Sequence, residues 1–185
     1  MADNFDRLRN RPVRTTTVTL ALNPDDGDKL TQARNALARA TTRAEFNPED
    51  GAAAQAMAEA EAELERVKAE VVTFTIHMRG IGPVRVEELV AQHKPTGDQV
   101  RAAKREDPKA HLGFNYDTLP PAFLAESVTS ITFSDDPDHP IESLSVSQAT
   151  ELWTSRWSSG DKMLIWQTAQ MLDAAPSMVG DLGND

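Results

Sequence analysis

The hydrophobic and polar positions of this chain follow first the period of a strand and then that of a helix. Between residues 13 and 22, apolar side chains take every second position from Val18 onward, and threonines fill many of the others. This alternation, rich in β-branched residues, is typical of a half-buried strand. From Leu30 to Ala44, and again from Met57 to Val67, apolar side chains recur every three or four residues, as on one face of a helix. The pattern predicts one strand followed by two helices.

The two predicted helices have matched lengths and a short connection. Asn23-Pro24 is a typical helix start, and the segment Phe46–Gly51 breaks the helical pattern. Each helix spans roughly 18 residues, or about 27 Å at 1.5 Å per residue. These features predict an antiparallel helical hairpin. A second alternating strand, Val71–Met78, follows and is expected to pair antiparallel with the first. Residues 13–80 are therefore predicted to form a β-α-α-β unit.

Beyond this unit, residues 81–175 are predicted to be mostly helical. Gly80 and Gly82 lack the third glycine of a dinucleotide-binding loop, so they predict a turn. A short helix is expected from Val84 to His93. The fold class predicted is α+β: a two-stranded antiparallel β-ribbon carrying a helical hairpin, followed by a mostly helical C-terminal half.

Two further helix starts are marked in the C-terminal half. Pro120 is expected to begin a helix that extends to Val128. Ser145 and Gln148 have the spacing of a capping box, which satisfies the first backbone N–H groups of a helix. The chain ends, residues 1–12 and 176–185, are expected to be disordered.

Composition narrows the classes of function. With 29 acidic and 19 basic residues the net charge is -10, so binding to nucleic acid is not expected. There is no cysteine, which excludes disulfides and thiol chemistry. No apolar run reaches the roughly 18 residues that span a bilayer, and the first residues lack the apolar stretch of a secretory signal. The expected location is the cytoplasm, with no membrane partner.

The candidate catalytic and metal-binding motifs are weak. Asp135, Asp136, Asp138 and His139 could supply metal ligands, but prolines interrupt them and calcium-loop spacing is absent. No histidine or base can be paired with a nucleophile. No enzyme activity, metal or cofactor is expected. A small metal-dependent enzyme that uses this loop remains an alternative.

Features typical of protein binding are stronger. Trp153 and Trp157 lie four residues apart, which would place them on one helical face, and Trp166 follows. They form either an aromatic core between two helices or a patch for a partner, since Trp is enriched at interface hot spots. Apolar side chains of the hairpin and of the segment after residue 112 are further candidates. The candidate protein-binding residues are Leu30, Leu37, Met57, Leu64, Phe114, Tyr116, Trp153, Trp157 and Trp166.

An ordered series of short motifs carries a family resemblance. The motifs are Val72-Thr73-Phe74-Thr75-Ile76, Arg79-Gly80-Ile81-Gly82, Glu87-Glu88-Leu89-Val90-Ala91-Gln92-His93, Phe114-Asn115-Tyr116-Asp117-Thr118-Leu119-Pro120-Pro121-Ala122 and Ala149-Thr150-Glu151-Leu152-Trp153. In this order, across Val13 to Ala175, the chain resembles the tail assembly chaperones of long-tailed, siphovirus-type phages and prophages of actinobacteria. It departs from their pattern at Lys94, where relatives have proline, and at Leu119, where they have phenylalanine.

The resemblance implies a non-catalytic assembly factor. Such proteins bind the long, mostly helical tape measure protein, keep it in solution and bring tail tube subunits to it in the host cell cytoplasm. The expected partners are therefore the tape measure protein and the major tail (tube) protein, with self-association as a further expectation. The alternative is a structural component of the virion, such as a head–tail connector or a minor tail protein.

Overall fold

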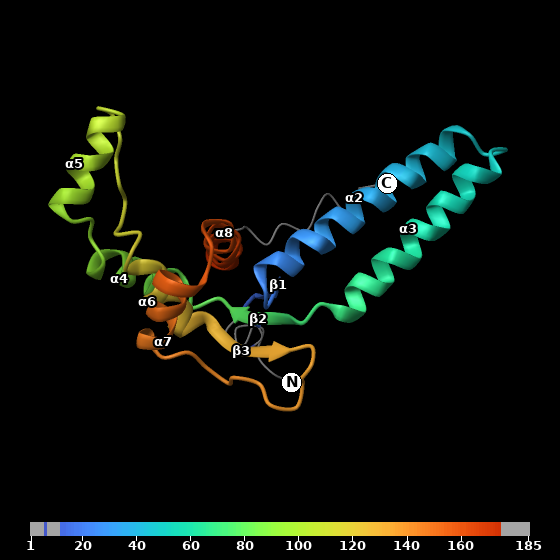
Figure 1. The fold of residues 1–185 in the computed structure, drawn as a ribbon. Helices are drawn as coiled ribbons and strands as arrows, with labels where there is room; N and C mark the ends of the chain where they lie inside the picture. The colour runs from blue at the N-terminus through green and yellow to red at the C-terminus, as the bar shows by residue number, and fades with distance from the viewer. Residues whose placement is uncertain (1–5, 7–11, 175–185) are drawn as a thin grey trace, which may run out of the picture. The chain divides into compact units, whose positions relative to one another are not determined.

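The computed structural model describes Asp6 and residues 12–174, and its elements are labelled in Figure 1. Most of the two predicted end segments, 1–12 and 176–185, lies outside the described residues. The elements are β1 (Thr15–Ala21), α2 (Pro24–Phe46), α3 (Gly51–Glu70), β2 (Thr73–Arg79), α4 (Pro83–Gln92), α5 (Gly97–Glu106), α6 (Leu119–Ser127), β3 (Val128–Phe133), α7 (Val146–Glu151), the π-helical turn η1 (Leu152–Arg156) and α8 (Ser159–Ala174).

The chain divides by its contacts into two compact units, and the boundary runs through the strands. The hairpin unit comprises Thr19–Thr75 and Thr132–Pro140. The helical unit comprises, of the described residues, those up to Val18, then Ile76–Ile131, and then Ile141 to Ala174. The boundary predicted at residue 80 directly follows the end of β2 at Arg79, and it stays a prediction.

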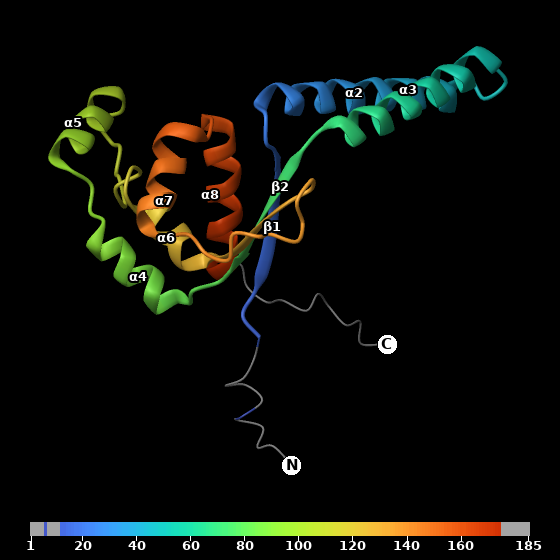
Figure 2. The same cartoon turned by 60° about the horizontal axis from the view of Figure 1, so that its bottom comes forward.

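The helical hairpin forms as the sequence predicts. Helices α2 and α3 lie antiparallel along their lengths (Figure 2). Asn23 caps α2 by accepting a hydrogen bond from the Asp25 N–H at 3.2 Å, and Asp50 caps α3 through the Ala52 N–H at 2.9 Å. Each cap satisfies one backbone donor that the first helical turn leaves unpaired.

The sheet has three antiparallel strands in the order β1-β2-β3, so the predicted two-stranded ribbon is incomplete. The missed strand is β3. Val128, expected in the helix that Pro120 begins, is instead its first residue. The six residues Val128–Phe133 are rich in β-branched and aromatic side chains, which fit a pleated surface. The backbone bond from the Ser134 N–H to the Thr73 carbonyl at 2.9 Å continues its pairing with β2.

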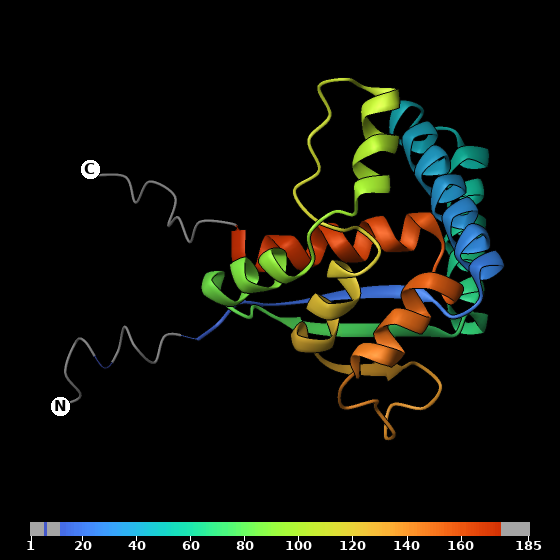
Figure 3. The same cartoon turned by 90° about the vertical axis from the view of Figure 1, so that its left-hand side faces the viewer.

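In the helical unit, α6 packs against α4, α7 and α8, and α4 also contacts α8 (Figure 3). Helix α6 is buried along most of its length, and Leu124 is fully enclosed. Ile165 and Ala169 of α8 are equally inaccessible. The predicted capping box is confirmed, because the Gln148 N–H donates to Ser145 Oγ and the Ser145 N–H donates to Gln148 Oε1. Helices this short are stabilised mainly by the packing of their apolar faces against one another.

The spacing of Trp153 and Trp157 does not follow an α-helix. Helix α7 ends at Glu151 and continues as η1, in which the Trp157 N–H bonds to the Leu152 carbonyl five residues earlier at 3.0 Å. Trp157 itself has an extended backbone. The expectation that one α-helical face carries both side chains is therefore wrong.

Candidate functional site

The candidate site is an apolar groove within the helical unit. Its walls and floor come from α4, α6, α8 and the segment before α6. The lining residues are Pro83, Val86, Glu87, Val90, Phe114, Leu119, Phe123, Trp166, Gln170 and Asp173. We call this feature the α4–α8 groove. Its volume is about 260 Å³, slightly below the roughly 300–1,000 Å³ of pockets that enclose small molecules.

Helical periodicity places both walls of the groove. On α4, Pro83, Val86, Glu87 and Val90 are spaced i, i+3, i+4 and i+7, so they share one face. On α8, Trp166, Gln170 and Asp173 are spaced i, i+4 and i+7 in the same way. The floor is formed by Leu119 and Phe123, which are almost completely buried. The wall valines are only half-buried, so apolar surface on this wall stays open to solvent.

An aromatic cluster stiffens one end of the groove. The ring centres of Phe114 and Trp166 lie 5.6 Å apart, and Phe123 meets Trp166 edge-on at the same distance. Tyr116 stacks at a tilt on Phe114 at 4.4 Å and is 50% exposed. The structure thus brings together three of the predicted binding residues, Phe114, Tyr116 and Trp166. Large, rigid aromatic side chains at a solvent boundary are typical of interface anchors.

Trp153 and Trp157 belong to the interior instead. Each is only 9% exposed, and their rings meet edge-on with centres 6.3 Å apart. The Nζ of Lys162 lies 6.0 Å from the Trp153 ring centre, within cation–π range. Of the two alternatives drawn from the sequence, these two tryptophans fit the aromatic core. Their part in partner binding stays a prediction.

The predicted hairpin residues pack mostly within the hairpin. Leu64 is buried in a cluster with Ala33, Val67 and Val71. Leu30 and Leu37 pack against that cluster, and Met57 is half-buried. These larger side chains supply most of the apolar area buried between α2 and α3, because the alanines beside them are small and bury little. Whether they also contact a partner stays a prediction.

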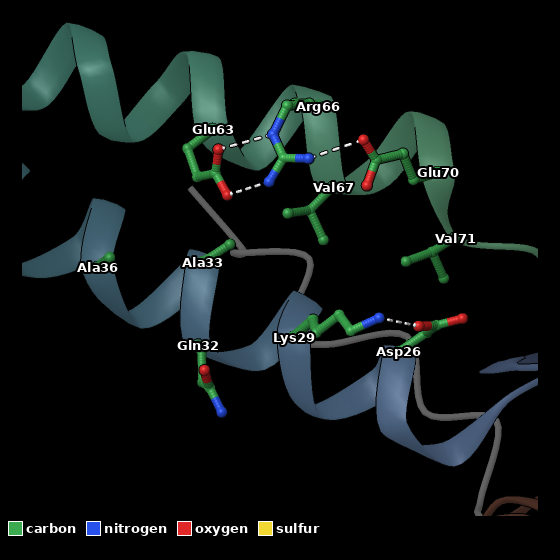
Figure 4. A pocket seen from close by; sticks show the side chains of 10 residues that line it. All are labelled: Asp26, Lys29, Gln32, Ala33, Ala36, Glu63, Arg66, Val67, Glu70 and Val71. Carbon is green, nitrogen blue, oxygen red and sulfur yellow. Dashed lines mark hydrogen bonds and ion pairs between the residues drawn. The ribbon is translucent and has the colours of Figure 1, made fainter.

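A second hollow, of about 530 Å³, lies between α2 and α3 and is lined by charged side chains (Figure 4). Lys29 Nζ pairs with Asp26 Oδ1 at 2.7 Å. Arg66 bridges Glu63 and Glu70, each at 2.7 Å, and the hydrogen bonds to these carboxylates raise the pKa of Arg66. Both cations are already neutralised by residues on their own helices. The hollow therefore offers no free cation to an anionic ligand.

The charge of the α4–α8 groove is acidic. Among its lining residues only Glu87 and Asp173 are charged. Asp173 is engaged, because its carboxylate accepts hydrogen bonds from the N–H groups of Ile81 and Gly82 at 3.1 and 2.9 Å. Glu87 is exposed and takes part in no ion pair or hydrogen bond with the described residues. It is the carboxylate that remains available at the rim.

An ion pair fixes α4 on α6 beside the groove. Arg85 Nε and Nη2 donate to the two oxygens of Glu126 at 2.8 and 2.6 Å, and Nη1 donates to Glu88 at 2.7 Å. The Arg85 guanidinium holds the pKa of Glu126 below its usual range, mainly through these hydrogen bonds. A two-pronged contact of this kind defines the orientation of the two helices.

The outward face of α8 extends the apolar surface. Met163, Leu164 and Met171 are 60%, 45% and 66% exposed. Met163 lies three residues before Trp166 and shares its side of the helix, so it continues the groove wall. These residues are not among the binding residues predicted from the sequence. The signal was present: the run Met163–Leu172 has no charged residue, in a chain that is 26% charged.

The described residues contain no group of three or more metal-ligating side chains. In the Asp135–His139 loop, His139 Nδ1 pairs with Asp136 Oδ1 at 2.7 Å, and the loop is exposed. Within residues 12–174, no helix combines the length and the apolar character that crossing a membrane requires.

The α4–α8 groove combines apolar walls, aromatic anchors and one available carboxylate, an arrangement suited to holding the face of another polypeptide.

Comparison of the chain with protein families, with curated proteins and with solved structures finds no match in any of the three.

Proposed function

We propose that this chain is a non-catalytic tail assembly chaperone that holds helical segments of a phage tape measure protein in the host cytoplasm. The observation that carries the proposal is the α4–α8 groove with its aromatic end. The groove is open and lined by half-buried apolar side chains, which is the form that amphipathic helices occupy in other binding proteins. The resemblance of the motifs to tail assembly chaperones supports the same reading.

The position of the motifs supports the proposal further. Two of the motif segments that carry the resemblance contribute directly to the groove: the segment from Glu87 to His93, through Glu87 and Val90, and the segment from Phe114 to Ala122, through Phe114 and Leu119. The groove thus gives these motifs a shared use in binding.

The charge of the chain suits a carrier whose client must later be released. A net charge of -10 keeps such a protein soluble while it covers apolar segments of the client. A groove of this size buries little area, so binding would be weak enough for tail tube subunits to displace the chaperone. Recruitment of those subunits is part of the same proposal.

Co-expression tests the function. The tape measure protein of the same genome is produced with this chain, without it, and with an unrelated acidic protein at the same level. We expect the tape measure protein to remain in the supernatant after centrifugation only when this chain is present. Equal amounts in all three supernatants would contradict the proposal.

The alternative, a structural virion component, makes a different prediction about particles. A chaperone leaves as the tube polymerises, so mass spectrometry of purified virions should not detect this chain. A fixed number of copies per particle would favour the connector or minor tail protein.

A further inference from the structure

We infer that the α4–α8 groove selects an amphipathic helix that carries a basic residue beside its apolar stripe. The carboxylate of Glu87 forms an ion pair with this residue. The inference rests on the proposed function, because it names the kind of client helix that the groove takes. It depends on three observations: the shape of the groove, the commitment of Asp173 and the exposure of Glu87.

The shape of the groove fits a helix. The α4 wall is ten residues long, about 15 Å at 1.5 Å per residue, which matches about three turns of a second helix. The apolar side chains of α4 on one side, and Trp166 with the more polar remainder of the α8 wall on the other, flank a floor of buried side chains. A helix with anchors at i, i+3 or i+4 and i+7 would place successive side chains along this floor. An enclosed pocket for one small molecule would lack such length.

The charge along the groove has one sign. Its lining includes two carboxylates and no lysine, arginine or histidine. Arg85, the cation nearest in sequence to the α4 residues that line the groove, already forms ion pairs with Glu126 and Glu88. A client helix with acidic flanks would therefore meet repulsion with no compensating cation in the lining. A helix with a lysine or arginine next to its apolar stripe would meet attraction.

Glu87 is the residue positioned to discriminate between client helices with basic flanks and client helices with acidic flanks. It lies on the same face of α4 as Val86 and Val90, so a side chain beside the client's apolar stripe would reach it. Asp173 cannot take the same part without giving up the backbone of the Gly80–Gly82 turn. The contact lies at the rim, where opposite charges set partner choice and association rate more than total affinity.

The experiment measures binding of two synthetic helical peptides to the purified full-length chain by fluorescence anisotropy. Both peptides carry the same leucine stripe and the same label. One has lysines beside the stripe, and the other has glutamates. At about 20 mM salt we expect the lysine peptide to bind about fivefold more tightly, with the difference shrinking as salt screens the charges.

Glu87→Lys is the decisive variant, because the residue is exposed and its replacement leaves the core untouched. We expect the preference for the lysine peptide to disappear or reverse. Glu61→Lys, an equal charge change at an exposed position of α3 in the hairpin unit, is the matched control and should keep the preference. Equal binding of the two peptides to the wild type, no binding of either, or an unchanged preference in Glu87→Lys would each overturn the inference.

Hydrogen exchange and sedimentation identify the occupant of the groove. Peptide-dependent protection of α4 and α8 supports the inference. Protection that instead rises with protein concentration, together with a dimer in sedimentation, would assign the groove to a second copy and overturn it. The peptide-binding experiment and the co-expression experiment test different claims, so either one can fail while the other succeeds. Selective peptide binding without an effect on the tape measure protein would leave the groove's selectivity intact and refute the proposed function.

Discussion

The carboxylate of Asp173, near the end of α8, accepts a hydrogen bond from the backbone N–H of Gly82 at 2.9 Å across 91 positions of sequence. A second bond, from the Ile81 N–H at 3.1 Å, reaches the other carboxylate oxygen. Gly82 lies at the start of α4, so one side chain fixes the first turn of one groove wall to the last turn of the other. The contact therefore joins the two walls of the α4–α8 groove.

Replacing Asp173 should loosen the helical unit. Asp173→Ala leaves two part-buried backbone N–H groups without their acceptor, so we expect the free energy of unfolding to fall by about 1–3 kcal/mol. Asp173→Asn keeps one carbonyl acceptor and should lose less. Urea denaturation followed by tryptophan fluorescence measures both. Equal stability of the alanine variant and the wild type would contradict the structural role.

Gly82 should resist replacement for a reason of backbone geometry. Its φ of 87° lies in the left-handed region, where a Cβ costs roughly 1–2 kcal/mol. Gly82→Ala should therefore lower the melting temperature. Gly113→Ala is the matched control, since a Cβ there meets nothing within 4 Å. If both variants melt alike, the strain assigned to Gly82 is absent.

The Arg85–Glu126 pair predicts a pH dependence. Because Arg85 lowers the pKa of Glu126 in the folded state, the pair stabilises the protein fully above the ordinary glutamate value of 4.5. That stabilisation should be lost as the pH falls from 4.5 through the lower folded value. The difference in unfolding free energy between the wild type and Glu126→Gln, measured from pH 7 to pH 3, should shrink in this range. In an Arg85→Gln background the same comparison should be flat, and a slope there would point to another group.

The two faces of α8 should behave differently on mutation. Ile165 is fully buried, so Ile165→Ala should cost about 2–5 kcal/mol of stability through the cavity it leaves. Met163→Ser with Met171→Ser changes exposed side chains and should leave the urea midpoint nearly unchanged. The double variant should nevertheless keep less tape measure protein in solution. Normal solubilisation by a stable double variant would remove α8 from the binding surface.

The local signals in the sequence predicted the hairpin well. Asn23 and Gln148 perform the capping expected of them, because caps depend on neighbours within a few residues. The strand β3 was missed, since the apolar spacing from Phe123 to Val128 fits a helix as well as a helix–strand junction. Only pairing with β2, more than fifty positions earlier, decides between them.

The groove could be predicted only in part. Aromatic content pointed to Phe114, Tyr116 and Trp166, and the structure brings them into one cluster. The same reasoning grouped Trp166 with Trp153 and Trp157. Trp153 and Trp157 instead pack against each other, because the π-helical turn and the packing of α8 depend on tertiary contacts. The bond between Asp173 and Gly82 has no signature in a single sequence.

Site-specific photo-crosslinking tests the central claim most directly. A benzophenone amino acid replaces Met163, at the exposed end of the α8 wall, or Glu61 on the hairpin, and each chain is co-expressed with the tape measure protein. We predict a covalent product with the tape measure protein from position 163, and far less from position 61. Equal products from both positions, or a product from position 163 that joins two copies of this chain, would contradict helix binding in the α4–α8 groove.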